Sequence, residues 1–157
     1  LTFVEEDVIK SLTVASGAQV IFEKDLTIGQ GEIFGTISGT SVFSNTGSLT
    51  VNQGGDILCD TLSNSGNLTV NQGGEVACKS FSNSGTMTVQ GTVTADTTFQ
   101  NTSYITVLPQ GALTTPGGEN QGVIENTGTW SNSGSITGEG IVVSTTEIPG
   151  AEDQRGG

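Results

Sequence analysis

Two cysteines are the side chains best suited to covalent chemistry in this sequence. Cys59 and Cys78 stand 19 residues apart and end the matching segments Gly-Gly-Asp-Ile-Leu-Cys and Gly-Gly-Glu-Val-Ala-Cys. If these segments stack as neighbouring strands about 4.8 Å apart, the two Cα atoms fall inside the window of roughly 4.4–6.8 Å that a disulfide needs. Such a bond would indicate an oxidising compartment. The alternative is a pair of buried free thiols that act as small apolar side chains.

The carboxylates offer a weaker possibility of metal binding. Asp56 and Glu75 occupy equivalent positions in the same two segments, and a calcium ion could bridge them if they stack. The calcium-binding nonapeptide Gly-Gly-x-Gly-x-Asp is absent, however, which favours two solvated neighbours. We therefore expect no metal and no other cofactor.

Two sequons could accept a glycan in an exported protein, Asn67-Leu-Thr69 and Asn101-Thr-Ser103. Asn67 is the better candidate, because Asn101 also belongs to a repeated turn described below. Catalysis is not expected. The chain has no histidine and a single arginine, Arg155, whereas polysaccharide-cleaving solenoids group aspartates with basic residues in a groove.

An internal repeat supplies the elements that position these side chains. A segment of the form apolar-Ser-Asn-Ser/Thr-Gly-x-apolar-Thr recurs in steps of 18 or 19 residues, and two overlapping copies follow it. Apolar residues alternate within each copy, which predicts strands, and the Asn-x-Gly and Gln-Gly-Gly pieces predict turns. The regular copies are residues 43–50, 62–69, 81–88 and 99–106, and the later ones contain Asn126 and Asn132.

Near-identical copies favour stacked coils over an antiparallel meander, because parallel stacking places like residues directly above one another. We predict an all-β fold, a single-stranded parallel β-solenoid (β-helix), right-handed by the usual preference, with about seven coils of 18–19 residues. The solenoid spans residues 1–148, regular over about 43–107, and residues 149–157 form an acidic Pro/Gly tail. Stacked amides would form a ladder of Asn45, Asn64, Asn83, Asn101, Asn126 and Asn132.

Composition and charge indicate an exported protein. Apolar residues make up 32% of the chain and glycine contributes 24 residues, which suits a thin solenoid core. The 16 acidic residues against 4 basic ones exclude a phosphate-binding surface, so no nucleic-acid partner is expected. No apolar run is long enough to insert into a membrane. The first residue, Leu1, suits a processed or excised protein, and we expect a secreted or cell-surface location.

The segment Ser-Asn-Ser-Gly-Asn-Leu-Thr-Val-Asn-Gln-Gly-Gly at residues 63–74 resembles repeats of secreted bacterial β-helix surface proteins. It is most similar to the passenger domains of self-associating autotransporter adhesins, and its pieces are also similar to coil motifs of polymorphic outer-membrane proteins. The likeness covers residues 11–140 in rhythm and composition, and no membrane-anchoring barrel follows. The resemblance implies a solenoid fold, an extracellular setting, and adhesion or self-association.

Three functions remain open at this stage. A solenoid with two uncapped ends would stack head to tail on further copies of itself, forming a surface fibre or layer. The well-ordered tail would then be held by a neighbouring subunit, or it folds back on its own solenoid. An adhesin would instead use polar faces to bind glycans or sister cells. An ice-binding surface is the third reading, on an outward column of Thr13, Thr27, Thr50, Thr69, Thr88 and Thr106 that has no second threonine column beside it.

Overall fold

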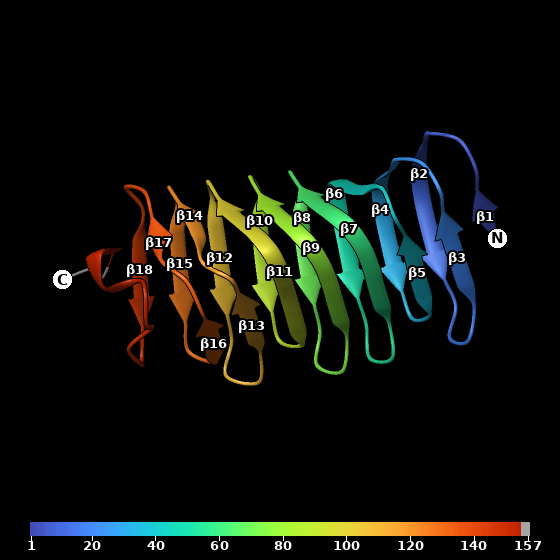
Figure 1. The fold of residues 1–157 in the computed structure, drawn as a ribbon. Helices are drawn as coiled ribbons and strands as arrows, with labels where there is room; N and C mark the ends of the chain where they lie inside the picture. The colour runs from blue at the N-terminus through green and yellow to red at the C-terminus, as the bar shows by residue number, and fades with distance from the viewer. Residues whose placement is uncertain (155–157) are drawn as a thin grey trace.

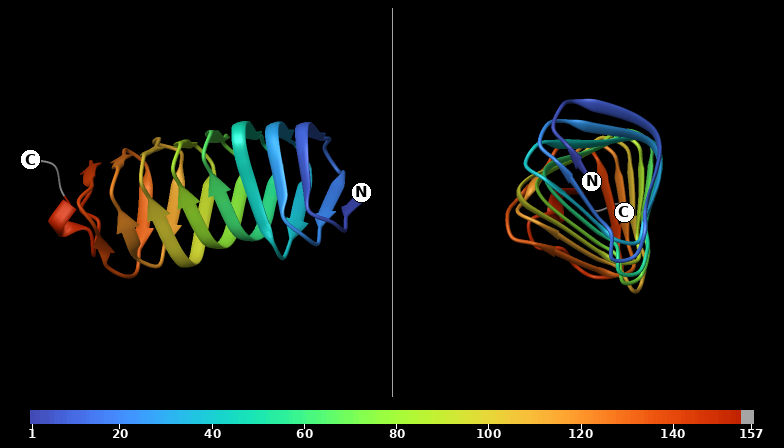
Figure 2. Two further views of the ribbon diagram at one scale, coloured as in Figure 1. Left: turned by 90° about the horizontal axis from the view of Figure 1, so that it is seen from above. Right: turned by 90° about the vertical axis from the view of Figure 1, so that its right-hand side faces the viewer.

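Short strands alternate with glycine-rich corners along the whole chain, so that each coil has three straight sides. The computed structural model describes residues 1–154, and these form a parallel β-solenoid whose coils stack along one axis (Figure 1). Seen along that axis the coils are roughly three-cornered loops (Figure 2). Every strand pairing among the described residues is parallel, so the predicted all-β solenoid is confirmed.

The strands are β1 (Thr2–Phe3), β2 (Asp7–Val14), β3 (Gln19–Phe22), β4 (Leu26–Ile33), β5 (Thr36–Gly39), β6 (Val42–Val51), β7 (Asp56–Asn64), β8 (Asn67–Val70), β9 (Glu75–Asn83), β10 (Thr86–Val89), β11 (Thr92–Asn101), β12 (Tyr104–Val107), β13 (Ala112–Thr115), β14 (Gly118–Asn120), β15 (Val123–Asn126), β16 (Thr129–Asn132), β17 (Ile136–Thr137) and β18 (Ile141–Ser144). A short 3-10 helix, η1 (Glu152–Gln154), follows them. We name the three faces from one coil: face A holds residues 61–64, face B holds β8, and face C holds residues 75–78.

Columns of inward side chains make the core. On face B one column steps through the described chain every 18 or 19 residues and passes through eight coils, one more than the seven predicted. The extra coil was hidden because glycine occupies its place in the column, and the side chains of Ile28 and Leu49 close over Gly31. The column is Leu12, Gly31, Leu49, Leu68, Met87, Ile105, Ile124 and Val142.

The outward threonine column is broken, which corrects the sequence prediction. Thr13 and Thr50 share a column on face B, but Glu32 lies between them. Thr27 lies on face A beside Ser44. The Leu-Thr-Ile segment at residues 26–28 resembles the face B segments in sequence, yet the chain uses it one face earlier. A threonine plane of the kind that an ice-binding surface needs is therefore absent from the described faces.

A ladder of buried asparagines runs along the corner between faces A and B. Each Nδ2 donates to the Oδ1 of the next asparagine at 2.8 Å, and it also donates to backbone carbonyls of the corner. The ladder begins at Asn45, whose Oδ1 is buried without a partner because Ile28 precedes it in the column. Its members are Asn45, Asn64, Asn83, Asn101 and Asn120.

The ladder's last members differ from the prediction. Asn126 lies on face B beside Val107 and Ser144, and Asn132 lies on face C beside Thr115. Asn120, which sequence reasoning missed, takes the next place instead. The reason is that the Asn-x-Gly turn moves to the other two corners in the last coils, so the motif no longer marks one position.

The C-terminal end of the solenoid is closed by its own chain. Ile148, Ala151 and Gln154 are buried, and the Ile136 N–H donates to Gly150 O at 2.7 Å. Gly138 leaves a gap in the ladder column, and the Gln154 side chain fills it: its Oε1 accepts from Asn120 Nδ2 at 2.9 Å. The tail thus folds back on its own solenoid. Residues 155–157, the end of the predicted tail, lie outside the described residues.

Replacing Gln154 by alanine should loosen this cap. The Gln154 Nε2 donates to the carbonyls of Asn120, Thr137 and Gly138 at 2.8–3.0 Å, and all of these bonds would be lost. We expect faster hydrogen exchange at the Ile136 amide and a loss of about 2 kcal/mol in the free energy of unfolding. The exposed Gln100 is the matched control, and an equal effect in Gln100→Ala would contradict the capping role.

The N-terminal end is open by comparison. β2 pairs with β4 on one side, and within residues 1–154 no strand pairs with its other edge. β1 covers two residues of β3 on face C. Phe3, Ile9 and Leu12 pack against the core but stay partly exposed, and Val8 is 74% exposed. The described residues include no helix of the length and apolarity that a membrane span requires.

Candidate functional site

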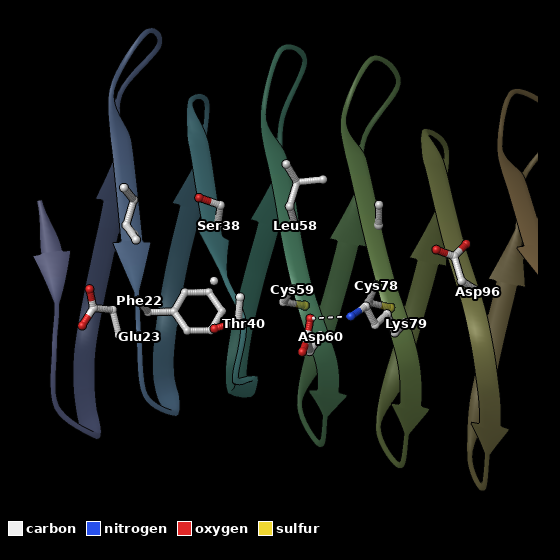
Figure 3. Close-up of a pocket in the computed structure, with 13 residues that line it drawn as sticks. Phe22, Glu23, Ser38, Thr40, Leu58, Cys59, Asp60, Cys78, Lys79 and Asp96 are labelled. Atoms are coloured by element: carbon white, nitrogen blue, oxygen red, sulfur yellow. Dashed lines mark ion pairs between the residues drawn. The ribbon is translucent and has the colours of Figure 1, made fainter.

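Cys59 and Cys78 lie where the repeat places them, as partners in neighbouring strands of face C. Both side chains are buried at 7% and 4% exposure beneath a shallow hollow of about 530 Å³ (Figure 3). Both are free thiols, so the structure shows the second of the two alternatives and no disulfide. Parallel stacking explains this, because equivalent atoms are about 4.8 Å apart while a disulfide draws its Cβ atoms to about 3.8 Å.

Burial makes both thiols weak acids. It raises the pKa of Cys59 well above its ordinary value, with the neighbouring Cys78 adding to the effect. It raises the pKa of Cys78 to about 12, and the carboxylate of Asp96 contributes. Both groups are therefore protonated at neutral pH, and the chain has no histidine that could activate them. The geometry supports packing and not nucleophilic chemistry.

These thiols should make the fold sensitive to alkali. Because the folded pKa of Cys78 lies above its unfolded value of 9.0, its contribution to stability is complete below pH 9 and is lost as the pH rises toward 12. At pH 10.5 we expect a loss of about 2 kcal/mol from Cys78 alone. Urea unfolding at pH 7 and 10.5 measures it, with Cys78→Ala as control. An equal pH dependence in that variant would contradict the assignment.

The other walls of the hollow are apolar and acidic. Ile21 and Leu58 stand on the outer surface of face C, and Glu23 and Asp96 border it (Figure 3). Lys79 Nζ lies 3.6 Å from Asp60 Oδ1, an exposed ion pair worth at most about 1 kcal/mol. The pair matches the stacking of these two residues in neighbouring copies of the repeat.

The two sequons differ in exposure. Asn101 is fully buried, and its Nδ2 donates to the carbonyls of Ser103 and Val123 and to Asn120 Oδ1. The nitrogen that a glycan would modify is therefore already engaged inside the ladder, and Asn101 is wrong as a glycosylation candidate for the folded chain. Asn67 is exposed at the start of β8 and stays a candidate.

The stacked acids form no larger cluster. Asp56 and Glu75 are strand partners on face C, as predicted from their equivalent positions. Within the described residues no group of three or more His, Cys, Asp or Glu side chains could hold a metal ion. The pair is compatible with two solvated neighbours.

A polar hollow that sequence reasoning did not identify as a site lies at the corner between faces B and C. Amide side chains and Gly73 line its volume of about 800 Å³, and we call it the amide shelf. Asn71 Nδ2 donates to Asn52 Oδ1 at 3.1 Å, while Asn52 Nδ2 is buried without a partner. The signal in the sequence was the doubled Asn-Gln-Gly-Gly turn. The lining residues are Asn52, Gln53, Asn71, Gln72, Gly73 and Gln90.

Comparison with known proteins assigns no family to this chain. No protein-family model, curated protein or solved structure matches it. Any function must therefore be argued from the residues and their arrangement.

Proposed function

We propose that the protein is an extracellular structural subunit, a β-solenoid rod that joins end to end with further copies in a surface fibre or layer. The observation that carries the proposal is the open N-terminal end. The eight residues of β2 have one unpaired edge within the described chain, and unpaired parallel edges recruit further strands. Partly exposed core residues lie at the same end and would be buried by a second copy.

The two ends of the rod are not equivalent, which refines the expectation of two open ends. Residues 148–154 cover the last coil on faces A and C, but β18 on face B pairs only with β15 among the described strands. Ile141 and Val143 on β18 are 47% and 50% exposed. We therefore assign the principal contact to the N-terminal end, with β18 as the strand that a head-to-tail neighbour would meet.

Surface properties support a structural role outside the cell. The net charge of −12 is spread over long polar faces, which keeps a rod soluble while its ends remain apolar. The resemblance of the repeats to autotransporter passengers points the same way. Buried, protonated thiols and stacked asparagines support packing, and we propose no catalytic activity.

Sedimentation over a concentration series, with negative-stain imaging, tests the proposal. We expect particles several rods long at high concentration, and we expect Val8→Lys to reduce them by placing a charge at the open edge. Leu58→Lys, on the side of the rod at 43% exposure, is the matched control. Val143→Lys reports whether β18 takes part. Particles that stay one rod long at every concentration would contradict the proposal.

A further inference from the structure

The amide shelf belongs to a longer row of side chains that runs parallel to the solenoid axis. The backbone N–H groups of Phe34, Asn52, Asn71, Gln90 and Leu108 donate to carbonyls of the preceding coil in the same pattern, so these five residues occupy one position in five successive coils. Three central amides are thus bounded by an apolar residue on each side. Parallel coils space the members of the row by about 4.8 Å.

The row has unused hydrogen-bonding capacity. Asn71 donates to Asn52, but the next place in the row is Phe34, which has no acceptor, so Asn52 Nδ2 stays buried without a partner. A buried amide without a partner costs about 1–3 kcal/mol, and a ligand oxygen would remove that cost. Gln53 and Gln72 occupy equivalent turn positions beside it and remain exposed. The shelf therefore presents amide donors and acceptors side by side.

Phe34 adds a flat apolar surface at one end of the row. The residue is 36% exposed although it is aromatic, and no ring contact is recorded for it. Aromatic faces pack against apolar faces of a ligand while neighbouring polar groups fix its orientation. An exposed ring followed by spaced amides suits a chain of sugar rings, which have apolar faces and hydroxyl edges.

The charge of the protein narrows the ligand class. A net charge of −12 repels anionic polymers, and no basic side chain lines the shelf. Regular spacing of the amides suits a repeating, extended ligand. We infer that the row from Phe34 to Gln90 is a binding site for an extended neutral glycan, with one sugar ring on Phe34 and hydroxyl groups bonded to Asn52, Asn71 and Gln90. This site goes beyond the proposed end-to-end assembly and does not depend on it.

Titration with cellohexaose and chitohexaose, followed by NMR of the side-chain amide groups, tests the inference. We expect shifts confined to the amides of the shelf and to the Phe34 ring, and hyaluronan hexasaccharide should leave them unchanged. Phe34→Ala and the double variant Gln53→Ala/Gln72→Ala should each weaken binding at least tenfold, while Phe34→Tyr should retain it. Leu58→Ala and Gln30→Ala, which remove exposed side chains elsewhere, are the matched controls.

Several outcomes would overturn the site. These are the absence of shifts at millimolar concentrations of both neutral hexasaccharides, equal shifts with the anionic one, or equal weakening in the controls. Because the variants change exposed side chains, amide spectra that match the wild type separate a lost site from a lost fold. Sedimentation of the same samples shows whether end-to-end assembly persists when glycan binding is lost.

Discussion

Replacing Gly66 by alanine is expected to lower the free energy of unfolding by more than about 3 kcal/mol, because the new methyl group has no room. A Cβ atom on Gly66 would lie 2.1 Å from the carbonyl oxygen of Gly47 in the preceding coil. The obstacle is backbone, and it cannot move alone. Gly85 sits equally close to Gly66 O in the next coil, so a shift at one level disturbs its neighbours.

Gly17→Ala is the control that separates lack of space from backbone strain. Gly17 has a φ of +81°, which disfavours alanine by roughly 1–2 kcal/mol, but nothing lies within 4 Å of its Cβ position. Gly66 has the opposite combination, since its φ is not in the left-handed region. Urea unfolding of both variants measures the difference. If Gly66→Ala proved no more costly than Gly17→Ala, the coils would not be packed as tightly as the corner geometry requires.

The central coils were predictable because three independent signals agreed there. Alternating apolar residues, a constant step of 18 or 19 residues and conserved turn chemistry all placed Cys59 beside Cys78 and Asp60 beside Lys79. Any error of one residue would have turned the inward columns outward. The fold class and the two cysteine positions therefore followed from periodicity alone.

The first and last coils were harder because one of those signals fails in each. Gly31 interrupts the apolar column, and Leu26 begins a face A strand with a sequence typical of face B. In the last coils the Asn-x-Gly turn changes corner, which misplaced Asn126 and Asn132. A local motif records a turn, but it does not say which of three corners the turn makes.

The cap and the amide shelf depend on contacts that no repeat encodes. Gln154 reaches Asn120 across 34 residues, and it fits only because Gly138 leaves the column empty. The shelf arises from the identity of the residues on either side of it, since Phe34 replaces an amide in the preceding coil. Both features could be found only after the register between coils was known.

Removing the side chain of Asn83 should be the most damaging change within the asparagine ladder. Asn83 Nδ2 donates to Asn101 Oδ1, Gly85 O and Tyr104 O, and its Oδ1 accepts from Asn64 Nδ2, all at 2.8–3.2 Å. Asn83→Ala leaves these buried groups short of partners and opens a cavity. We expect a loss of about 3–5 kcal/mol in the free energy of unfolding, measured by urea denaturation.

Asn45→Ala is the matched comparison, because Asn45 makes the same kinds of donor contact but accepts no hydrogen bond. Its Oδ1 already bears the cost of a buried acceptor without a partner, and alanine removes that atom. The loss at Asn45 should therefore be smaller than the loss at Asn83 by about 1–2 kcal/mol. Equal losses would mean that the amide-to-amide bonds contribute nothing beyond the corner bonds, and that asparagine recurs there for its turn conformation alone.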